Sequence, residues 1–247
     1  MIQRISAVLL VTATLAFSLA MPQDASAQAT STADVVLVLP FENISNHTEY
    51  NWIGESFADS LAVLLNKPGL IVVSSDERAV AYQRLRLPLT VLPSRATAIK
   101  IAREVKASMI VIGTYNVAVA PPPDDRSKPQ SETLASIAGE ARVVRVNEGR
   151  MAGDLFEGGW APRVYDFGGP VTTLQSMQGQ LAYQILFQCD KALSFSRNYL
   201  VQEATKVPPQ AFEAFMKGLL TAERGSTRAI YFKNAMRLYA KENGGAV

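Results

Sequence analysis

The chain has 247 residues, with 24 Lys and Arg against 22 Asp and Glu, and its formal net charge at pH 7 is +2. So small an excess of positive charge does not indicate a nucleic-acid partner or an anionic membrane surface. The single cysteine, Cys189, excludes an internal disulfide, so the core must hold the fold together.

Residues 1–27 have the pattern of a secretory signal peptide. Arg4 precedes an apolar segment of 16 residues from Ile5 to Ala20, and Ala25-Ser26-Ala27 forms an A-x-A cleavage signal. The alternative is an uncleaved membrane anchor, but a spanning helix needs about 20 apolar residues. We therefore expect cleavage after Ala27, a periplasmic mature chain without an integral membrane span, and a short linker over residues 28–33.

The mature protein should begin at Gln28, because the cleavage signal ends at Ala27. Amino-terminal sequencing of protein recovered from the periplasm checks this expectation. A first residue at Met1, or recovery in the cytoplasm alone, would contradict it.

The first half of the chain alternates between apolar runs and helical patterns. Continuous apolar runs bounded by turn residues indicate strands covered on both faces, and apolar residues at three- and four-residue steps indicate helices. A capping box at Ser74 to Glu77 and a cap at Ser94 mark two helix starts. The expected elements are a strand over 35–39, a helix over 52–65, a strand over 70–73, a helix over 74–85, a helix over 94–105 and a strand over 109–115.

The second half begins with a Pro-rich segment, residues 120–129, that we expect to be an exposed loop. The expected elements after it are a strand over 137–146, a hairpin turn over 147–150, a strand or coil over 160–167 and a long helix over 171–193 that contains Cys189. The order of strands and helices predicts an α/β fold over residues 34–200, with a mixed sheet, a parallel core and helices on both faces.

Three stretches of the chain resemble the TolB amino-terminal-like family, which is related to the curli secretion protein CsgG and the flagellar protein FlgO. They are Val38–Ser45, Trp52–Phe57 and Ala107–Tyr115, and the resemblance covers roughly residues 34–193. The resemblance implies a periplasmic α/β domain, similar in topology to anticodon-binding domains. It also implies a role in protein contacts rather than catalysis.

Residues 201–247 have the pattern of an α-helical hairpin. Its two amphipathic helices resemble one tetratricopeptide unit, and in the TolB-like family such repeats often follow the α/β domain. A solenoid of this kind generally needs about three repeats, so the pair must dock on the main domain, meet a partner or fray. We expect a chain ending at Ala204 to fold and to lose its partner or its self-association.

Candidate catalytic groups are few. His47 is the sole histidine, Cys189 has no neighbouring ligand, and no phosphate-binding glycine loop occurs, so we expect no metal, no cofactor and no catalytic site. The alternative is an exported hydrolase in which His47 activates a nearby serine, Ser56, beside the carboxylate of Asp59. Ser56 lies in a segment that lacks the second glycine of a nucleophile elbow.

The export pattern, together with what the TolB-like resemblance implies, predicts an exported, non-enzymatic interaction module of the bacterial cell envelope, whose partner is an envelope protein or a second copy of the chain. Open α/β sheets bind ligands at the carboxyl ends of their strands, which points to the loop after the first strand. The alternative is that Asn43 and Ser45 only shape that turn. The expected contact residues are Asn43, Ser45, Asn46, His47 and Tyr50 in the loop and Phe212, Phe215, Phe232 and Tyr239 in the tail.

Overall fold

The computed structural model of the chain describes residues 33–89, 92–120, 135–156, 159–188, 196–221 and 225–244. The expected signal peptide, most of the Pro-rich loop and Cys189 lie outside the described residues. Within these ranges, every helix is too short or too polar to cross a membrane.

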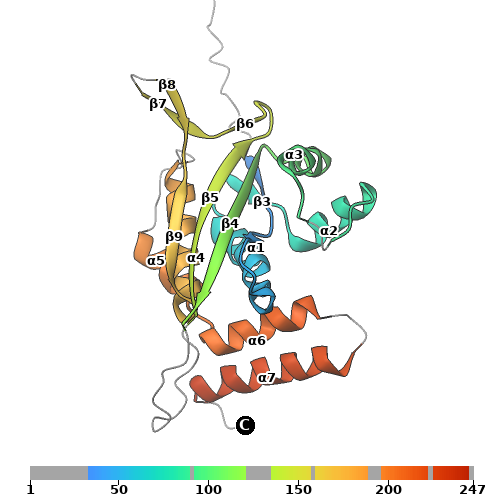
Figure 1. The fold of residues 1–247 in the computed structure, drawn as a ribbon, viewed down its shortest axis with the longest axis vertical. Helices are drawn as coiled ribbons and strands as arrows, with labels where there is room; N and C mark the ends of the chain where they lie inside the picture. Colours follow the sequence, from blue (N-terminus) through green and yellow to red (C-terminus); the bar gives the residue numbers. More distant parts are fainter. Residues whose placement is uncertain are drawn as a thin grey trace, which may run out of the picture. The chain divides into compact units, whose positions relative to one another are not determined.

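Three strands form the parallel core of the sheet: β1 (Asp34–Val38), β3 (Leu70–Val72) and β4 (Met109–Val119). They lie in the order β3-β1-β4, so β1 has a parallel neighbour on each side (Figure 1). Val36 of β1 is opposite Val72 on one side and Met109 on the other. The parallel core predicted from the apolar runs is confirmed, and β4 continues four residues beyond the expected end at Tyr115.

The rest of the sheet is mostly antiparallel. β5 (Ala135–Arg145) pairs with β4 along its whole length, and its far side pairs with β6 (Arg150–Met151) and β9 (Tyr165–Pro170). The short strand β2 (Glu42–Asn43) runs parallel to β4. The expected turn before residue 150 is present, with Gly149 at a φ of 65°. The sequence did not predict the separate hairpin of β7 (Gly153–Phe156) and β8 (Gly159–Pro162).

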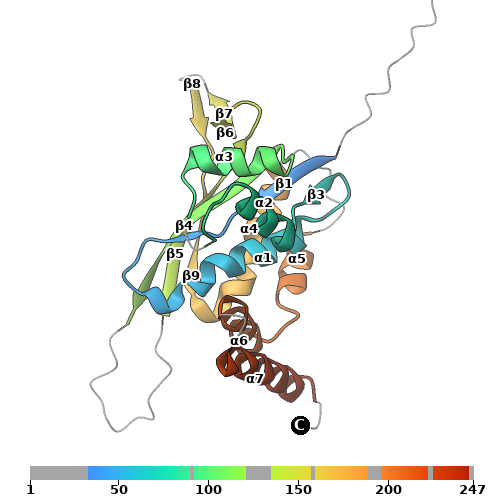
Figure 2. The same cartoon turned by 90° about the vertical axis from the view of Figure 1, so that its right-hand side faces the viewer.

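Helices cover both faces of the sheet, as predicted (Figure 2). Alternate residues of each central strand point to opposite faces, so Val36, Val38 and Val111 pack in one cluster and Leu37 and Ile110 in the other. Helices α1 (Trp52–Leu65) and α4 (Leu174–Gln188) cover the first face, and α2 (Ser75–Arg84) and α3 (Arg95–Glu104) cover the second. The predicted α/β class with a mixed sheet is therefore confirmed.

Local capping fixes where α2 and α3 begin. The Ser74 hydroxyl accepts a hydrogen bond from the backbone N–H of Glu77 at 3.2 Å, and the Glu77 carboxylate accepts from the backbone N–H of Ser74 at 2.9 Å. This is the expected capping box, and its hydrogen bonds from Ser74 lower the pKa of Glu77. Ser94 likewise accepts from the backbone N–H of Thr97 at the start of α3.

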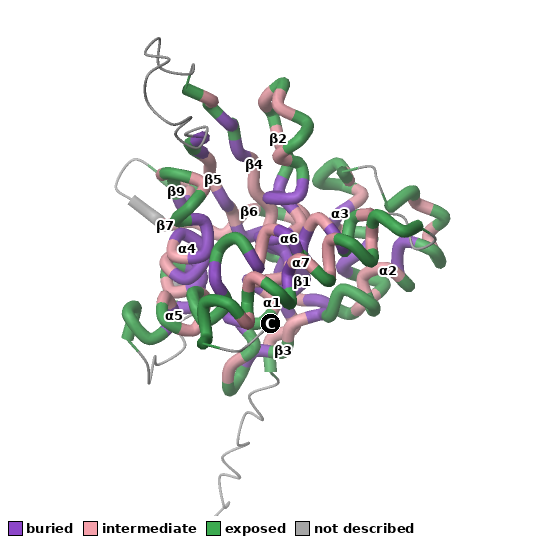
Figure 3. The backbone as a smooth tube through the Cα atoms, turned by 90° about the horizontal axis from the view of Figure 1, so that it is seen from below, coloured by how far each residue is buried: buried purple, intermediate pink, exposed green. Residues whose placement is uncertain are grey.

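The described part of the chain ends in three helices, α5 (Arg197–Ala204), α6 (Pro209–Leu220) and α7 (Ser226–Glu242). The expected hairpin is formed by α6 and α7, whose Phe215 and Phe232 rings lie 5.8 Å apart. Helix α6 packs against α1, and its Met216 is fully buried in the first cluster. Helix α7 packs on α6 and is largely exposed or half-buried (Figure 3). The expected boundary between residues 200 and 201 lies inside α5, whose Leu200 is also fully buried.

Candidate functional site

The loop after β1 is organised by the side chain of Asn43. Its Nδ2 donates to the carbonyl oxygen of His47 at 2.9 Å and to Oδ1 of Asn51 at 2.8 Å. Its Oδ1 accepts from the backbone N–H and the hydroxyl of Ser45, at 3.0 and 2.6 Å. These contacts favour the alternative reading of Asn43 and Ser45, as residues that shape the turn.

The hydroxyl of a buried tyrosine, Tyr115, forms hydrogen bonds with both the end of the loop and the start of α1. The Tyr115 hydroxyl donates to the carbonyl oxygen of Tyr50 at 3.0 Å and accepts from the backbone N–H of Gly54 at 3.1 Å. Burial raises the pKa of Tyr115, so the hydroxyl stays protonated and can donate. Gly54 also allows α1 to approach the loop closely, because a Cβ there would lie 2.1 Å from the carbonyl oxygen of Phe41.

The outer surface of the loop carries Asn46, which is exposed, and His47, which is half-buried. Nδ1 of His47 lies 3.2 Å from Oε1 of Glu49, and the His47 ring meets the Tyr50 ring edge-on. Ile44 beside them is 62% exposed and is not among the contact residues predicted from the sequence. In the sequence, the only sign of this exposed residue was an apolar side chain between two polar turn residues, Asn43 and Ser45.

Asn43→Ala should loosen this loop without unfolding the domain. It removes four hydrogen bonds, so we expect faster amide hydrogen exchange over residues 44–51 and a loss of about 1–2 kcal/mol of stability. Asn46→Ala is the matched control, because Asn46 is exposed, and it should change stability by less than about 0.5 kcal/mol. Equal exchange rates in both variants would show that Asn43 does not organise the loop.

A groove joins this loop to the carboxyl-terminal helices, and we call it the Tyr50–Phe212 groove. It encloses about 260 Å³ between the start of α1, the end of β9, the short helix η2 (Val171–Thr173), the start of α4 and the start of α6. Two predicted contact residues from distant parts of the sequence therefore line one site. The lining residues are Tyr50, Trp52, Ala135, Pro170, Val171, Thr172, Leu174, Gln175, Pro209, Gln210, Phe212 and Glu213.

Two buried residues of the groove have polar atoms without a hydrogen-bond partner in the described structure. Trp52 is 5% exposed and its Nε1–H has no acceptor, and Gln175 is 4% exposed and its Oε1 has no donor. The amide orientation of Gln175 is fixed, because Nε2 donates to the carbonyl oxygens of Ala204 and Val207 at 3.0 Å each. Both atoms are inaccessible to solvent, so the donor and the acceptor are buried beneath the groove and are not exposed in it.

The remaining predicted tail residues do not line this groove. Phe215 and Phe232 pack against each other between α6 and α7, and Tyr239 on α7 is 48% exposed. The loop residues Asn43, Ser45, Asn46 and His47 are also absent from its lining. The predicted contact set is therefore distributed over the loop, the groove and the hairpin.

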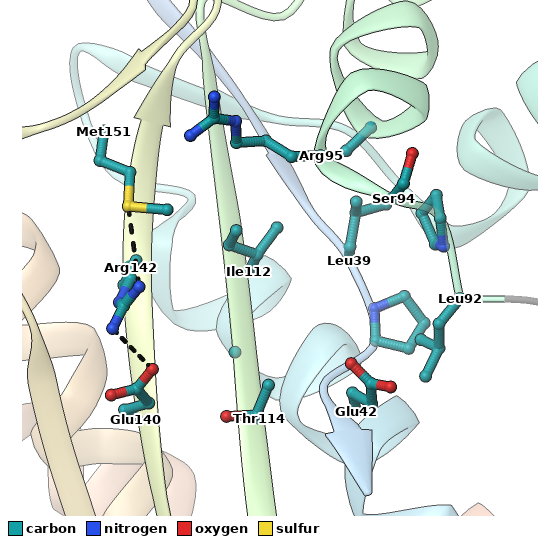
Figure 4. A pocket seen from close by; sticks show the side chains of 14 residues that line it. Leu39, Glu42, Leu92, Ser94, Arg95, Ile112, Thr114, Glu140, Arg142 and Met151 are labelled. Carbon is teal, nitrogen blue, oxygen red and sulfur yellow. Dashed lines mark hydrogen bonds and ion pairs between the residues drawn. The ribbon is translucent and has the colours of Figure 1, made fainter. Parts of the chain in front are cut away.

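A second cavity of about 260 Å³ lies on the other face of the sheet, where β1 ends beside β4 (Figure 4). Ile112 lies between the walls of the cavity, and Arg95 at the start of α3 and Glu42 of β2 lie at opposite ends of the view. The Arg142 guanidinium pairs with Glu140 at 2.9 Å, and its Nε has no partner in the described structure. The chain leaves β1 toward β3 on one side and leaves β4 toward β5 on the other, and open α/β sheets bind ligands where the connections of two neighbouring strands diverge in this way.

The residues of the hydrolase alternative are not assembled. The Ser56 hydroxyl is fully buried in α1, donates to the carbonyl oxygen of Ile53 at 2.7 Å and accepts from Nε2 of Gln178 at 3.0 Å. Burial raises the pKa of Asp59, and the nearby Glu55 carboxylate adds to this effect. Among the described residues, no serine hydroxyl is hydrogen-bonded to the His47 ring, and no group of three or more His, Cys, Asp or Glu side chains could hold a metal ion.

Comparison with known proteins gives no family profile that matches the chain and no match among curated proteins. The TolB-like resemblance therefore remains an expectation from the sequence. Among solved structures, the lipoprotein GNA1162 from Neisseria meningitidis is similar with a TM-score of 0.41 at 13% identity, over 63% of this chain and 97% of that one. The LpoB carboxyl-terminal domain from Salmonella enterica is similar with a TM-score of 0.34 at 18% identity, over 58% and 85% of the two chains. The PelC dodecamer from Paraburkholderia phytofirmans gives 0.34 at 14% identity, over 64% and 89%. We draw no functional conclusion from likenesses at these values.

Proposed function

We propose that the chain is an exported, non-enzymatic protein-interaction module of the bacterial cell envelope. The observation that carries the proposal is the Tyr50–Phe212 groove, in which aromatic and apolar side chains lie beside a few polar residues such as Thr172 and Gln210. Concave sites of this composition are typical binding sites, and the polar groups within them set the orientation of what binds. The pattern of residues 1–27 supports export, and the family resemblance supports a protein partner.

The partner is an envelope protein or a second copy of the chain, and it contacts the groove together with the outer surface of the neighbouring loop. Exposed Ile44 and half-buried Tyr50 give this surface an apolar component beside polar Asn46 and His47. Interfaces commonly combine such an aromatic and apolar centre with a polar rim.

Site-specific photo-crosslinking in cells tests this proposal. A photoreactive phenylalanine at Tyr50 should give a discrete crosslinked product in the envelope fraction, which mass spectrometry identifies. The same group at Val63 is the matched control, because Val63 is 68% exposed on α1 and does not line the groove. Identical product patterns from the two positions, or no product from Tyr50, would overturn the proposal.

A further inference from the structure

The helices on the second face of the sheet cover only part of β4. Ile110 is fully buried in the cluster under α2 and α3, and Ile112 is half-buried. Asn116 and Ala118, further along the same face, are exposed. The cavity of about 260 Å³ beside Ile112 lies where this cover ends, and we call it the Arg95–Glu42 cavity (Figure 4).

One wall of the Arg95–Glu42 cavity is formed by two cross-strand pairs of β4 and β5. Ile112 is opposite Arg142, and Thr114 is opposite Glu140. The Arg142 guanidinium and the Glu140 carboxylate form an ion pair at 2.9 Å. These two charges therefore neutralise each other, and this wall attracts neither an anion nor a cation.

The other two charged residues of the lining, Arg95 and Glu42, are not paired. Neither side chain has an ion pair or hydrogen bond with another residue in the described part of the chain. Both residues are exposed, so a ligand in the cavity can reach their charged groups. Figure 4 shows them at opposite ends of the cavity, with Ile112 and Leu39 between them. The cavity thus has one free positive end, one free negative end and an apolar middle.

This arrangement of charge selects a ligand that carries both signs. An anion would be attracted by Arg95 and repelled by Glu42, and a cation would meet the reverse. A zwitterion whose charges are separated is attracted at both ends. Because Leu39 and Ile112 lie in the middle, an apolar side chain between the two charges of the ligand would gain further affinity by burial.

The size of the cavity limits the length of such a zwitterion. Its volume of about 260 Å³ is below the usual 300–1,000 Å³ of pockets for drug-sized ligands. A sphere of this volume is roughly 8 Å across, and an extended chain advances about 3.3–3.6 Å per residue, so two residues span it.

We propose that the Arg95–Glu42 cavity binds a free dipeptide with an apolar side chain, its carboxylate at Arg95 and its ammonium at Glu42. A guanidinium can donate two parallel hydrogen bonds to a carboxylate, and a carboxylate accepts from an ammonium. The cavity shares no lining residue with the Tyr50–Phe212 groove, so this site is independent of the proposed interaction role.

The test is isothermal titration calorimetry of the purified full chain with three related ligands. Ala-Leu carries both charges, acetyl-Ala-Leu lacks the ammonium and Ala-Leu-amide lacks the carboxylate. We expect saturable binding of Ala-Leu and about tenfold weaker binding of each of the other two, because each loses one charge-assisted hydrogen bond. This comparison leaves the protein unaltered.

Two variants assign the two ends of the cavity. Arg95→Gln should weaken the binding of Ala-Leu and acetyl-Ala-Leu about tenfold and leave that of Ala-Leu-amide unchanged. Glu42→Gln should weaken the binding of Ala-Leu and Ala-Leu-amide by a similar factor and leave that of acetyl-Ala-Leu unchanged. Lys100→Gln and Asp76→Asn are the matched controls, because both residues are exposed outside the cavity, and they should bind all three ligands as the parent chain does.

Three results would overturn the inference. Equal affinity for the three ligands would show that the cavity recognises the apolar side chain alone. No saturable binding of Ala-Leu up to millimolar concentration would show that the cavity does not take a dipeptide. A loss of affinity that is equal in the control variants, or that does not follow the missing charge, would show that Arg95 and Glu42 do not hold the two ends.

Discussion

Val111→Asp should leave the chain unfolded at 25 °C, and Ile110→Ala should fold with its free energy of unfolding lowered by about 2–4 kcal/mol. Both residues are fully buried in β4, and they belong to the two core clusters on opposite faces of the sheet. An aspartate at 111 would bury a carboxylate among the apolar residues of the α1 and α4 face. The alanine at 110 would leave a cavity under α2 and α3.

Val63→Asp is the matched control for the aspartate substitution, because Val63 is 68% exposed on α1. It should shift the urea midpoint by the equivalent of less than about 0.5 kcal/mol, measured by circular dichroism. Near-neutral effects of both Val111→Asp and Ile110→Ala would contradict a sheet that is covered on both faces.

Met216→Ala should lower the free energy of unfolding by about 2–5 kcal/mol, whereas Met236→Ala should change it by less than about 0.5 kcal/mol. The two methionines lie on the two helices of the hairpin. Met216 on α6 is fully buried in the main core cluster, and Met236 on α7 is 72% exposed. Comparing the two variants therefore distinguishes the stability that comes from docking of α6 on the domain from the stability that comes from packing within the hairpin.

Two truncations test the same docking of α6, and they replace the expectation from the sequence that a chain ending at Ala204 folds. A chain ending at Thr221 removes α7 and should stay folded, because α7 packs on α6. A chain ending at Ala204 also removes α6, uncovers the core around Met216 and should be strongly destabilised. Cooperative unfolding at an unchanged urea midpoint in the shorter chain would show that α6 is dispensable.

The sequence by itself determined the local elements and the fold class. Apolar runs predicted β1, β3 and β4, and the capping residues Ser74 and Ser94 predicted the starts of α2 and α3. These features depend on neighbouring residues, because strand burial, helix periodicity and capping hydrogen bonds act over a few positions of the chain. The order of the elements then restricted the topology to a sheet with a parallel core.

Only the tertiary structure decided which candidate residues share a site. Tyr50 and Phe212 were both predicted contacts, but the packing of α6 against α1 places them in one groove and places Phe215 against Phe232 outside it. The buried Trp52 donor and Gln175 acceptor carried no sequence signal, since an apolar helix face predicts burial and not whether a polar atom finds a partner. Hydrogen-bond satisfaction depends on atoms far apart in the chain, and it is fixed only when the helices pack.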